Sequence, residues 1–410
     1  MLQALPLVFI LAGLTLYTLL GGADLGAGFW QLTAMRSRDD DLREYAHRAM
    51  GPVWEANHVW LIFVLTVFWT AYPKAFGSIA STLAVPLFLA LIGILFRGVT
   101  YALRAGARTS HELTRIDTIF SLSSILVPFA LGAAIGAIAT DRVPVGNAAG
   151  AQWSSWLSVT SILIGILAVA VAAHLAAVYL AADAARDSNQ ELELRFRSRA
   201  LGSGIVAGGL ALATVFASDV DSHSLFHSLA EGRATALVVL SAIAGTTTLV
   251  LVARRRYELA RCGAAVAVGT ILVGWAVSRW PRILPGLTAH QAAAGHDTLV
   301  CLAVTLVGGC VILLPALALL FELTLRRRFQ TAELPAGTTA IPLPSEPNRA
   351  MLIRVAAACL LAGVGLLNLA DATWAHAFGV AALLSFVAVA FIALAVPPPT
   401  RPPGSNGRTA

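Results

Sequence analysis

The sequence predicts an all-α fold, a polytopic bundle of about eleven transmembrane helices. Of its 410 residues, 58% are hydrophobic and only 12% are charged, whereas about a quarter of the residues in an ordinary soluble domain are charged. The mean hydropathy is +0.77. Apolar runs of about 20 residues, each long enough to cross a bilayer as a helix, recur along the chain. Basic residues collect in alternate loops between these runs, as in a membrane protein with several spans.

Each apolar run marks one expected span. The first run has no basic segment before it and continues past the length of a signal peptide, so we expect it to be retained as a helix. The predicted spans cover residues 4–31, 52–72, 77–103, 117–140, 154–182, 198–218, 234–253, 258–280, 298–325, 351–371 and 374–396.

The distribution of Lys and Arg predicts the orientation of these spans. Of the 28 Lys and Arg residues, 22 fall on one side of the predicted membrane and 5 on the other, with Arg97 inside the third span. Because basic residues concentrate in cytoplasmic loops, we expect the N-terminus outside and the C-terminus in the cytoplasm. The net charge is +6, but the basic residues lie in short clusters between apolar spans, which is typical of membrane topology and argues against nucleic acid as a partner.

Composition divides the chain into four parts. Residues 1–328 carry nine of the predicted spans and form the expected transmembrane domain. Residues 329–350 are rich in Pro and Thr, which is typical of a flexible linker, here on the cytoplasmic side. We expect an extra transmembrane hairpin at residues 351–397 and a disordered tail at residues 398–410.

Metal and redox motifs are absent from the sequence. The four cysteines form no CxxC or CxxCH motif, so neither an attached haem nor a thiolate metal cluster is indicated. They are interpreted as buried, unreactive thiols: Cys262, Cys301, Cys310 and Cys359. We predict no metal site.

The histidines offer no convincing pair of haem ligands. His58 and His174 are expected at membrane depth, and His376 near an outer helix end. A neutral imidazole both donates and accepts hydrogen bonds, so His58 is a candidate for a proton relay, with simple packing as the alternative. Four others fall in outer loops, where a solvated side chain is the simpler interpretation: His223, His227, His290 and His296.

Three ionisable residues are predicted at similar membrane depth, toward the cytoplasmic side. Asp24 lies near the end of the first span, Glu55 at the start of the second, and Arg97 near the end of the third. A charged group inside a bilayer is costly and needs a partner, water or a function. Because the three spans are consecutive, two carboxylates and one guanidinium are expected to form a buried cluster that holds a transferable proton. The alternative is that the acids face headgroups and Arg97 extends to the interface.

Small and aromatic residues surround the two acids. Gly22, Gly26 and Gly28 flank Asp24 and favour a closely packed site. Trp54 and Trp60 flank the motif of Glu55, either as part of the packed wall or as members of the aromatic belt at the interface.

Three motifs carry a family resemblance. LGGADLGAGFW contains Asp24, GPVWEANHVWL contains Glu55 and Asn57, and LFRGV contains Arg97. In this order and spacing they resemble subunit II of the cytochrome bd family of quinol oxidases. The resemblance extends more loosely through SRWPRILPGLTAHQAAAGHDTLV and covers residues 1–328.

The resemblance implies a haem-free, nine-helix subunit of the bacterial cytoplasmic membrane that pairs with a haem-bearing subunit I. Haems b and d are expected in the partner, quinol is the expected substrate of the complex, and oxygen is reduced to water. Asp24, Glu55 and Arg97 would then line a proton route from the cytoplasm toward the partner's haem, and no catalytic residue is expected in this chain. Whether a structural quinone or a lipid binds here stays open.

The chain departs from the family pattern at three places. The family commonly has DGFD where this chain has Gly21 to Asp24, so the first acid is missing, and WDGN appears as Trp54 to Asn57, with Glu55 one methylene longer than Asp. The last two spans have no counterpart in a nine-helix subunit. They are either an added packing hairpin or a replacement for a small accessory subunit.

Two other functions compete with the oxidase subunit. Buried acids and an Arg also describe a proton-coupled secondary transporter, although no inverted repeat is evident. A purely structural assembly subunit would tolerate replacement of Asp24 and Glu55 without loss of turnover. Copurification with a haem protein separates oxidase from transporter, and carboxylate replacement separates a conductor from a scaffold.

Overall fold

The computed structural model describes residues 2–37, 39–49, 53–104, 106–107, 109–325, 349–369 and 373–395. The chain divides into two compact units, Met1–Ala318 and Leu319–Ala410, and each is described by itself. Most of the predicted linker and the whole predicted tail lie outside the described residues.

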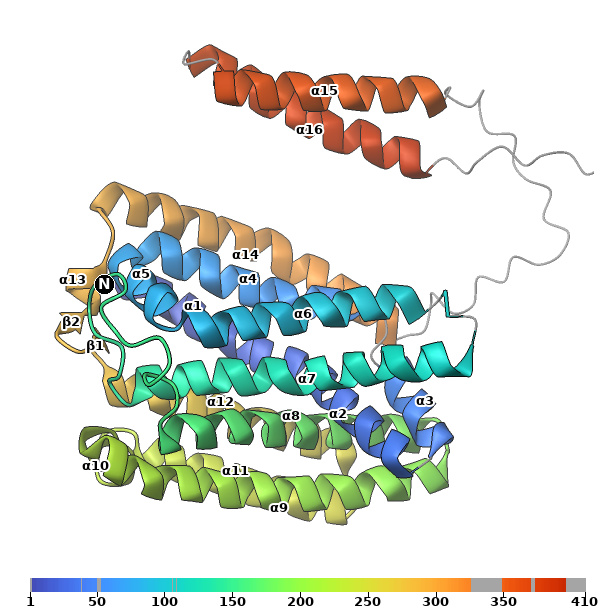
Figure 1. Ribbon diagram of the computed structural model, residues 1–410, viewed down its shortest axis with the longest axis vertical. Helices are drawn as coiled ribbons and strands as arrows, with labels where there is room; N and C mark the ends of the chain where they lie inside the picture. Colours follow the sequence, from blue (N-terminus) through green and yellow to red (C-terminus); the bar gives the residue numbers. More distant parts are fainter. Residues whose placement is uncertain are drawn as a thin grey trace, which may run out of the picture. The chain divides into compact units, whose positions relative to one another are not determined.

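The described chain is almost entirely helical (Figure 1), which confirms the predicted fold class. Eight helices are long and apolar enough to cross a membrane, and three further apolar helical segments are shorter. The elements in chain order are α1 (Leu5–Leu16), the π-helix η1 (Tyr17–Gly21), α2 (Gly22–Ser37), α3 (Asp40–Ala49), α4 (Val53–Ala71), α5 (Pro73–Thr82), α6 (Ala84–Arg104), α7 (Ser110–Ala139), α8 (Val159–Arg186), α9 (Gln190–Asp221), α10 (His223–Ala230), α11 (Thr235–Ala253), α12 (Tyr257–Arg279), β1 (Arg282–Leu284), β2 (Leu287–Thr288), α13 (Ala289–Ala292), α14 (His296–Leu325), α15 (Arg349–Leu369) and α16 (Thr373–Ala395).

The first and third predicted spans differ from the structure in detail. The first is not one regular helix, because the π-turn η1 separates α1 from α2, and α2 continues to Ser37. The third is divided at Leu83 into α5 and α6, and α5 begins earlier than predicted, at Pro73, whose ring suits the first turn of a helix.

Several short elements were not predicted, since they lack a long apolar run. Helix α3 is amphipathic: Leu42 and Ala46 are fully buried while its acidic residues face outward. The β1–β2 hairpin and α13 form where the sequence suggested only a loop.

Local hydrogen bonds explain where the long helices begin. Thr109 and Glu112 form a capping box at the start of α7, with the Thr109 side chain accepting from the Glu112 backbone N–H. Ser158 caps α8 and Asn189 caps α9 in the same way. Ser188, between α8 and α9, has a left-handed φ of 58°, which allows an abrupt reversal of the chain.

Helix α7 lies at the centre of the packing that positions the site. It packs on α6 and on α8, and α2 packs on both α7 and α8. A Cβ placed on Gly136 of α7 would lie 2.5 Å from Ser161 Cα of α8, so these backbones approach closely because the side chain is missing. Helix α8 also packs on α9, α11 on α12, and α1 on α4.

The loops rich in Arg meet at one end of the first unit, the end that carries α3 (Figure 1). We call it the α3 end. Helix α3, the turn from α6 to α7, the turn from α8 to α9 and the turn from α11 to α12 lie there. The opposite end carries α5, α10, α13 and the strands. The chain therefore alternates between two ends, one basic and one with few basic residues.

The second unit contains a helical hairpin. Helices α15 and α16 pack against each other along their length, and a Cβ on Gly363 would lie 2.7 Å from Leu383 Cγ. Ala356 and Ala375 are buried in this unit.

Candidate functional site

Asp24 and Arg97 form a buried ion pair between α2 and α6. Arg97 Nη2 lies 2.5 Å from Asp24 Oδ1 and also donates to the Asp24 backbone carbonyl, at 3.3 Å. The exposed fractions are 7% for Asp24 and 1% for Arg97. Two opposite charges at this separation and burial stabilise each other far more than a surface pair does.

Helix α7 holds the guanidinium in place. Arg97 Nη1 donates to Ser124 Oγ, and the Ser124 hydroxyl donates in turn to the Phe120 carbonyl. The Arg97 guanidinium carbon lies 4.5 Å from the centroid of the Phe120 ring, a cation–π contact. A Cβ on Gly28 would lie 2.3 Å from Ser124 Oγ, so this glycine lets α2 approach Ser124.

The π-turn and α4 form the other wall of the site. Asn57 Nδ2 donates to the Leu20 carbonyl of η1 at 3.3 Å, a backbone group turned outward by the irregular turn. The rings of Tyr17 and His58 meet edge to face, with their centroids 6.1 Å apart. Both side chains are near enough to Asp24 to interact with it electrostatically. Asp24 is thus surrounded by Arg97, Tyr17 and His58.

Two polar atoms in this wall remain available for a further hydrogen bond. Asp24 Oδ2 and Tyr17 Oη are buried and have no hydrogen-bond partner among the described residues. Buried polar groups are almost always satisfied, by protein or by ordered water. A carboxylate oxygen and a phenol in one buried wall are suited to accept and donate a proton.

A second charged cluster lies between the pair and the α3 end. Arg104 Nε donates to the fully buried Asp117 at 2.9 Å, and Arg104 Nη2 donates to Glu44 of α3 at 2.9 Å. His47 of α3 packs against Phe120, with ring centroids 6.1 Å apart. Because Phe120 also contacts Arg97, His47 and Phe120 connect this second cluster to the ion pair.

The environment of His47 opposes its protonation. Burial lowers the pKa of the imidazole below its ordinary value of 6.5, and the neighbouring Arg104 guanidinium acts in the same direction. A His whose folded-state pKa is depressed stabilises the fold above its unfolded pKa, and this contribution is lost as the pH falls through the folded-state pKa.

We therefore expect the free energy of unfolding of the wild type to decrease as the pH is lowered below about 6.5. The free energy of unfolding of His47→Gln is expected to decrease less over the same pH range. Thermal unfolding of both proteins on either side of that pH, at constant ionic strength, measures the difference; equal slopes would contradict the expectation.

Not all residues chosen from the sequence have described side chains. Trp54 and Glu55 belong to the first turn of α4, but their side chains lie outside the described part, as does that of His376. Trp60 packs edge to face on Phe63, with 6.3 Å between the ring centroids. The structure brings together Asp24, Arg97 and His58 with the motif residue Asn57.

The packing glycines divide into two kinds. Gly26 lies directly against α8, because a Cβ there would be 1.9 Å from the Ala172 carbonyl oxygen. Gly22 is less crowded, because a Cβ there would lie 3.5 Å from Leu175 Cδ1, an ordinary contact distance.

Sequence reasoning missed five residues of the site and its approach. Tyr17 and Ser124 carry no charge, and Glu44, His47 and Asp117 fall in or beside a predicted loop. A signal existed for Asp117: an acid at the first residue of the predicted fourth span, with the polar run SLSS beginning four residues later, is unusual for a lipid-facing surface.

The two membrane-depth histidines have separate surroundings. His174 Nδ1 lies 3.0 Å from the Ala200 carbonyl, whereas the His58 ring packs edge to face on Tyr17. Among the described residues, no group of three or more His, Cys, Asp or Glu is placed to hold a metal ion.

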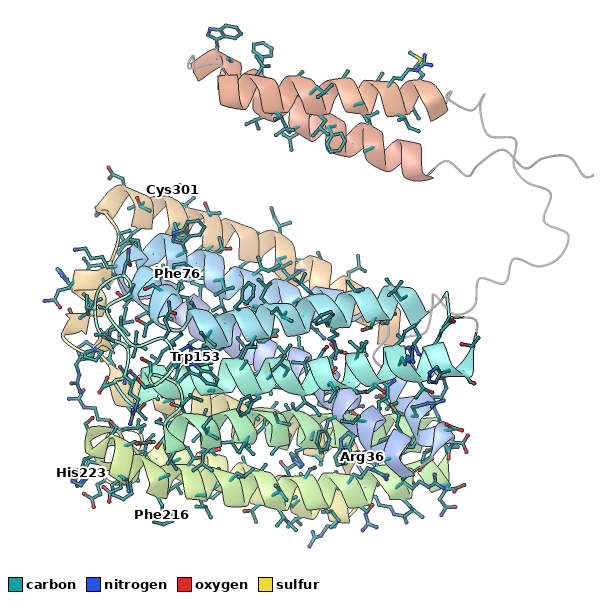
Figure 2. The ribbon with its side chains drawn as sticks, in the orientation of Figure 1. Arg36, Phe76, Trp153, Phe216, His223 and Cys301 are labelled. Atoms are coloured by element: carbon teal, nitrogen blue, oxygen red, sulfur yellow. The ribbon has the colours of Figure 1, made fainter. Side chains whose placement is uncertain are left out.

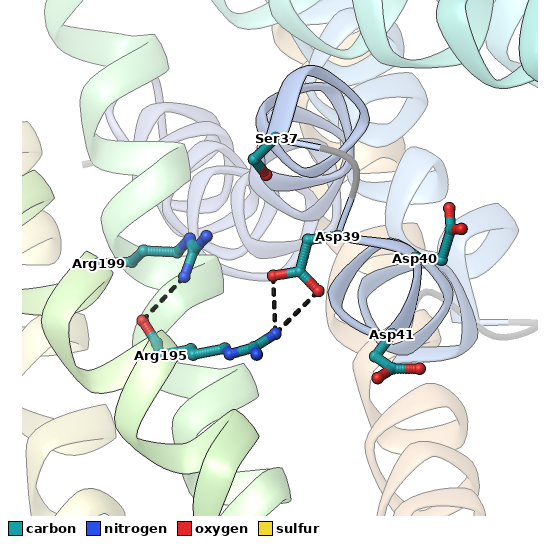
Figure 3. Close-up of a pocket in the computed structure, with 6 residues that line it drawn as sticks. All are labelled: Ser37, Asp39, Asp40, Asp41, Arg195 and Arg199. Carbon is teal, nitrogen blue, oxygen red and sulfur yellow. Dashed lines mark hydrogen bonds and ion pairs between the residues drawn. The ribbon is translucent and has the colours of Figure 1, made fainter.

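A charged recess lies apart from the ion pair, at the α3 end (Figure 3). Its volume is about 630 Å³. Figure 3 shows Arg195 of α9 reaching Asp39, with the two contacts at 2.8 and 2.9 Å. This ion pair joins the turn before α3 to α9 and explains why the recess is polar. It is lined by Ser37, Asp39, Asp40, Asp41, Arg195 and Arg199.

Comparison with known proteins gives concordant matches. The family model described as cytochrome bd terminal oxidase subunit II matches residues 2–324. Curated relatives include the cytochrome bd ubiquinol oxidase subunit 2 of Bacillus subtilis strain 168, 26% identical over 113 residues (28% of this chain, 33% of the relative). Another is the cytochrome bd-I ubiquinol oxidase subunit 2 of Escherichia coli K12, 27% identical over 130 residues (31% of this chain, 34% of the relative). These alignments span about a third of each curated relative.

The fold also has a solved counterpart. The bd oxidase structure from Geobacillus thermodenitrificans contains a chain that superposes with a TM-score of 0.64 at 22% identity, over 79% of this chain and 98% of that one. Together with the apolar helices, these matches make the protein a multi-pass protein of the bacterial inner membrane, and it belongs to the cytochrome bd terminal oxidase subunit II family.

Proposed function

We propose that the chain is the haem-free subunit II of a quinol:oxygen oxidoreductase and that its Asp24–Arg97 pair conducts protons to a haem-bearing subunit I. Family membership and the names of the curated relatives support the assembly. The observation that supports conduction is the buried pair itself, with a second carboxylate oxygen that no described side chain binds. Haems b and d are assigned to the partner, as the resemblance to the family implies.

The proposed route begins at the α3 end. The excess of basic residues there supports a cytoplasmic location for this end. Half-exposed Glu44 meets Arg104 at the surface, and Arg104 contacts buried Asp117. His47 and the Phe120 ring lie between this cluster and Arg97. Protons cross the remaining separations through water, as in other buried polar routes.

Asp24 is suited to pass a proton on, because two opposing effects act on it. Burial disfavours the charge of a carboxylate, whereas an adjacent guanidinium favours it, and Asp24 is both buried and paired with Arg97. Addition of a proton at Oδ2 would leave the Oδ1 contact to Arg97 in place. Tyr17 and His58 lie on the side of Asp24 away from the cytoplasmic cluster and are the proposed next groups. Glu55, whose side chain lies outside the described residues, belongs to the same proposal through its position one turn before His58.

Asp24→Asn is expected to lower quinol-driven oxygen uptake by about 10²-fold, the usual effect of removing a proton-transferring group. The amide keeps the shape of the carboxylate and accepts from Arg97, but it carries no transferable proton. The measurement is oxygen uptake by the purified complex, normalised to haem from a reduced-minus-oxidised spectrum. The matched control is Asp40→Asn on exposed Asp40, which is expected to retain wild-type uptake.

The same preparation tests the competing functions. If a haem-bearing partner copurifies and both Asp24→Asn and Glu55→Gln keep full oxygen uptake, the chain is a structural subunit that conducts no protons. A colourless protein that purifies alone and consumes no oxygen would instead indicate a proton-coupled transporter. The proposal assigns residues 1–328 to the oxidase domain and treats α15 and α16 as an added packing hairpin, since the family match ends at residue 324.

A further inference from the structure

Four side chains form a continuous chain of contacts at the junction of α9 and α10. Asp219, His223, His227 and Glu231 follow one another at intervals of four residues. His223 Nδ1 lies 2.5 Å from Asp219 Oδ1, and His227 Nδ1 lies 2.9 Å from Glu231 Oε2. The two Nε2 atoms lie 2.9 Å apart, and the rings cross at 87°. Figure 2 shows His223 at the outer edge of the end opposite α3.

The hydrogen bonds fix how the two imidazoles face each other. A carboxylate only accepts hydrogen bonds, so each Nδ1 carries the proton that it donates to Asp219 or Glu231. Each Nε2 of a neutral ring then presents a lone pair, and the two lone pairs point at the same place. Two lone pairs at 2.9 Å repel each other unless a proton or another cation lies between them. The geometry is therefore that of two rings that share a positive ion, either a proton on one Nε2 or a metal ion bound to both.

We propose that His223 and His227 bind a divalent transition-metal ion, Zn²⁺ or Cu²⁺, through their Nε2 atoms. Two His at i and i+4 on one helix face are a known metal-binding arrangement, and imidazole suits both ions. Metal–N bonds of 2.0–2.1 Å at a tetrahedral angle require the nitrogens about 3.3 Å apart, so a small rotation of the exposed rings suffices. The protein supplies two ligands, and water fills the other positions.

Asp219 and Glu231 complete the site without touching the metal. Ligating histidines usually donate their second N–H to a carboxylate, which fixes the ring orientation and increases the basicity of the metal-binding nitrogen. Here both histidines have such a carboxylate. Of the two rings, His223 is 70% and His227 51% exposed, so an ion reaches them directly from solution.

The junction is held firmly enough to present a preformed pair. Leu225 and Leu229, on the other face of α10, are buried against the bundle. Asp221, two residues before His223, accepts from Arg142 and from the backbone N–H of Thr160. These contacts fix the direction of α10 relative to α9.

The test is a Cu²⁺ titration of the purified complex, prepared with a tag that contains no histidine, and followed by calorimetry and electron paramagnetic resonance. We expect one bound Cu²⁺ per chain with two nitrogen ligands in the spectrum. Asp219→Asn and Glu231→Gln are expected to weaken binding about 10- to 100-fold, and His223→Gln with His227→Gln to abolish it. His296→Gln, which removes another exposed histidine, serves as the matched control and is expected to bind like the wild type.

Two results would overturn the proposal. One is the absence of stoichiometric Cu²⁺ and Zn²⁺ binding by the wild type, which would mean that the two rings share only a proton. The other is binding that survives the double His→Gln substitution. Oxygen uptake and thermal unfolding of each variant check that the complex is intact. The metal-binding measurement uses neither of these readouts, so its result does not depend on whether the proposed proton route is correct.

Discussion

Arg97→Gln is expected to destabilise the protein by about 3–5 kcal/mol, the cost of removing one partner from a buried ion pair. The substitution leaves the Asp24 carboxyl buried, 7% exposed, without the guanidinium that lies 2.5 Å from it. It also removes the donor to Ser124 and the cation–π contact with Phe120. Thermal unfolding of the purified complex, with retention of haem as a second readout, measures the loss.

A double-mutant cycle separates charge from shape. Asp24→Asn combined with Arg97→Gln removes both charges and leaves two amides that can bond to each other, so the double variant should be more stable than Arg97→Gln alone. Arg186→Gln is the matched control, because Arg186 pairs with Asp183 at 2.6 Å on the exposed surface. Its expected cost is within about 1 kcal/mol. If Arg97→Gln unfolded no more readily than Arg186→Gln, the buried pair would not be the stabilising contact described here.

The helical class was predictable because its signal is strong and local. A run of some 20 apolar residues has few alternatives to a membrane helix, and each predicted span corresponds to one or more described helices. What the pattern missed is set by weaker or longer-range forces. Among the described side chains of α3, only Leu42 and Ala46 are fully buried. The π-helix η1 is irregular in the middle of an apolar run, where composition carries no signal for it.

The site was predictable only in part, for a related reason. The cost of charge in a bilayer singled out Asp24 and Arg97, and the order of the spans suggested that they were neighbours. Their supporting residues required coordinates, since Ser124 is one of several serines on α7 and Tyr17 is an uncharged residue in the middle of the first predicted span. The contact of His47 with Phe120 depends on α3 folding back against α2, α6 and α7, which no local pattern indicated.

Gly26→Ala is expected to cost about 3 kcal/mol or more, at the upper end of what one added methyl does in a packed interior. The new Cβ would lie 1.9 Å from the Ala172 carbonyl oxygen and 2.8 Å from Ala176 Cβ. The obstructing atom is backbone, so no side-chain rotation relieves the clash, and α2 and α8 must separate. That separation also strains the bond from Trp30 Nε1 to the Ala173 carbonyl, now 2.8 Å. Yield in the membrane and thermal unfolding of the complex measure the effect.

Gly22→Ala, on the same helix, is the matched control. Its Cβ would meet only Leu175 Cδ1, at an ordinary contact distance of 3.5 Å, and alanine favours a helix by up to about 1 kcal/mol over glycine. The two substitutions add the same methyl group four residues apart on either side of Asp24, so a difference between them isolates the close approach of α2 to α8. If Gly26→Ala is destabilised and its oxygen uptake falls while Gly22→Ala keeps both, the backbone contact positions Asp24 against Arg97. Equal behaviour of the two variants would mean that α2 is free to shift, and the geometry of the ion pair would then have to be set by α6 and α7 alone.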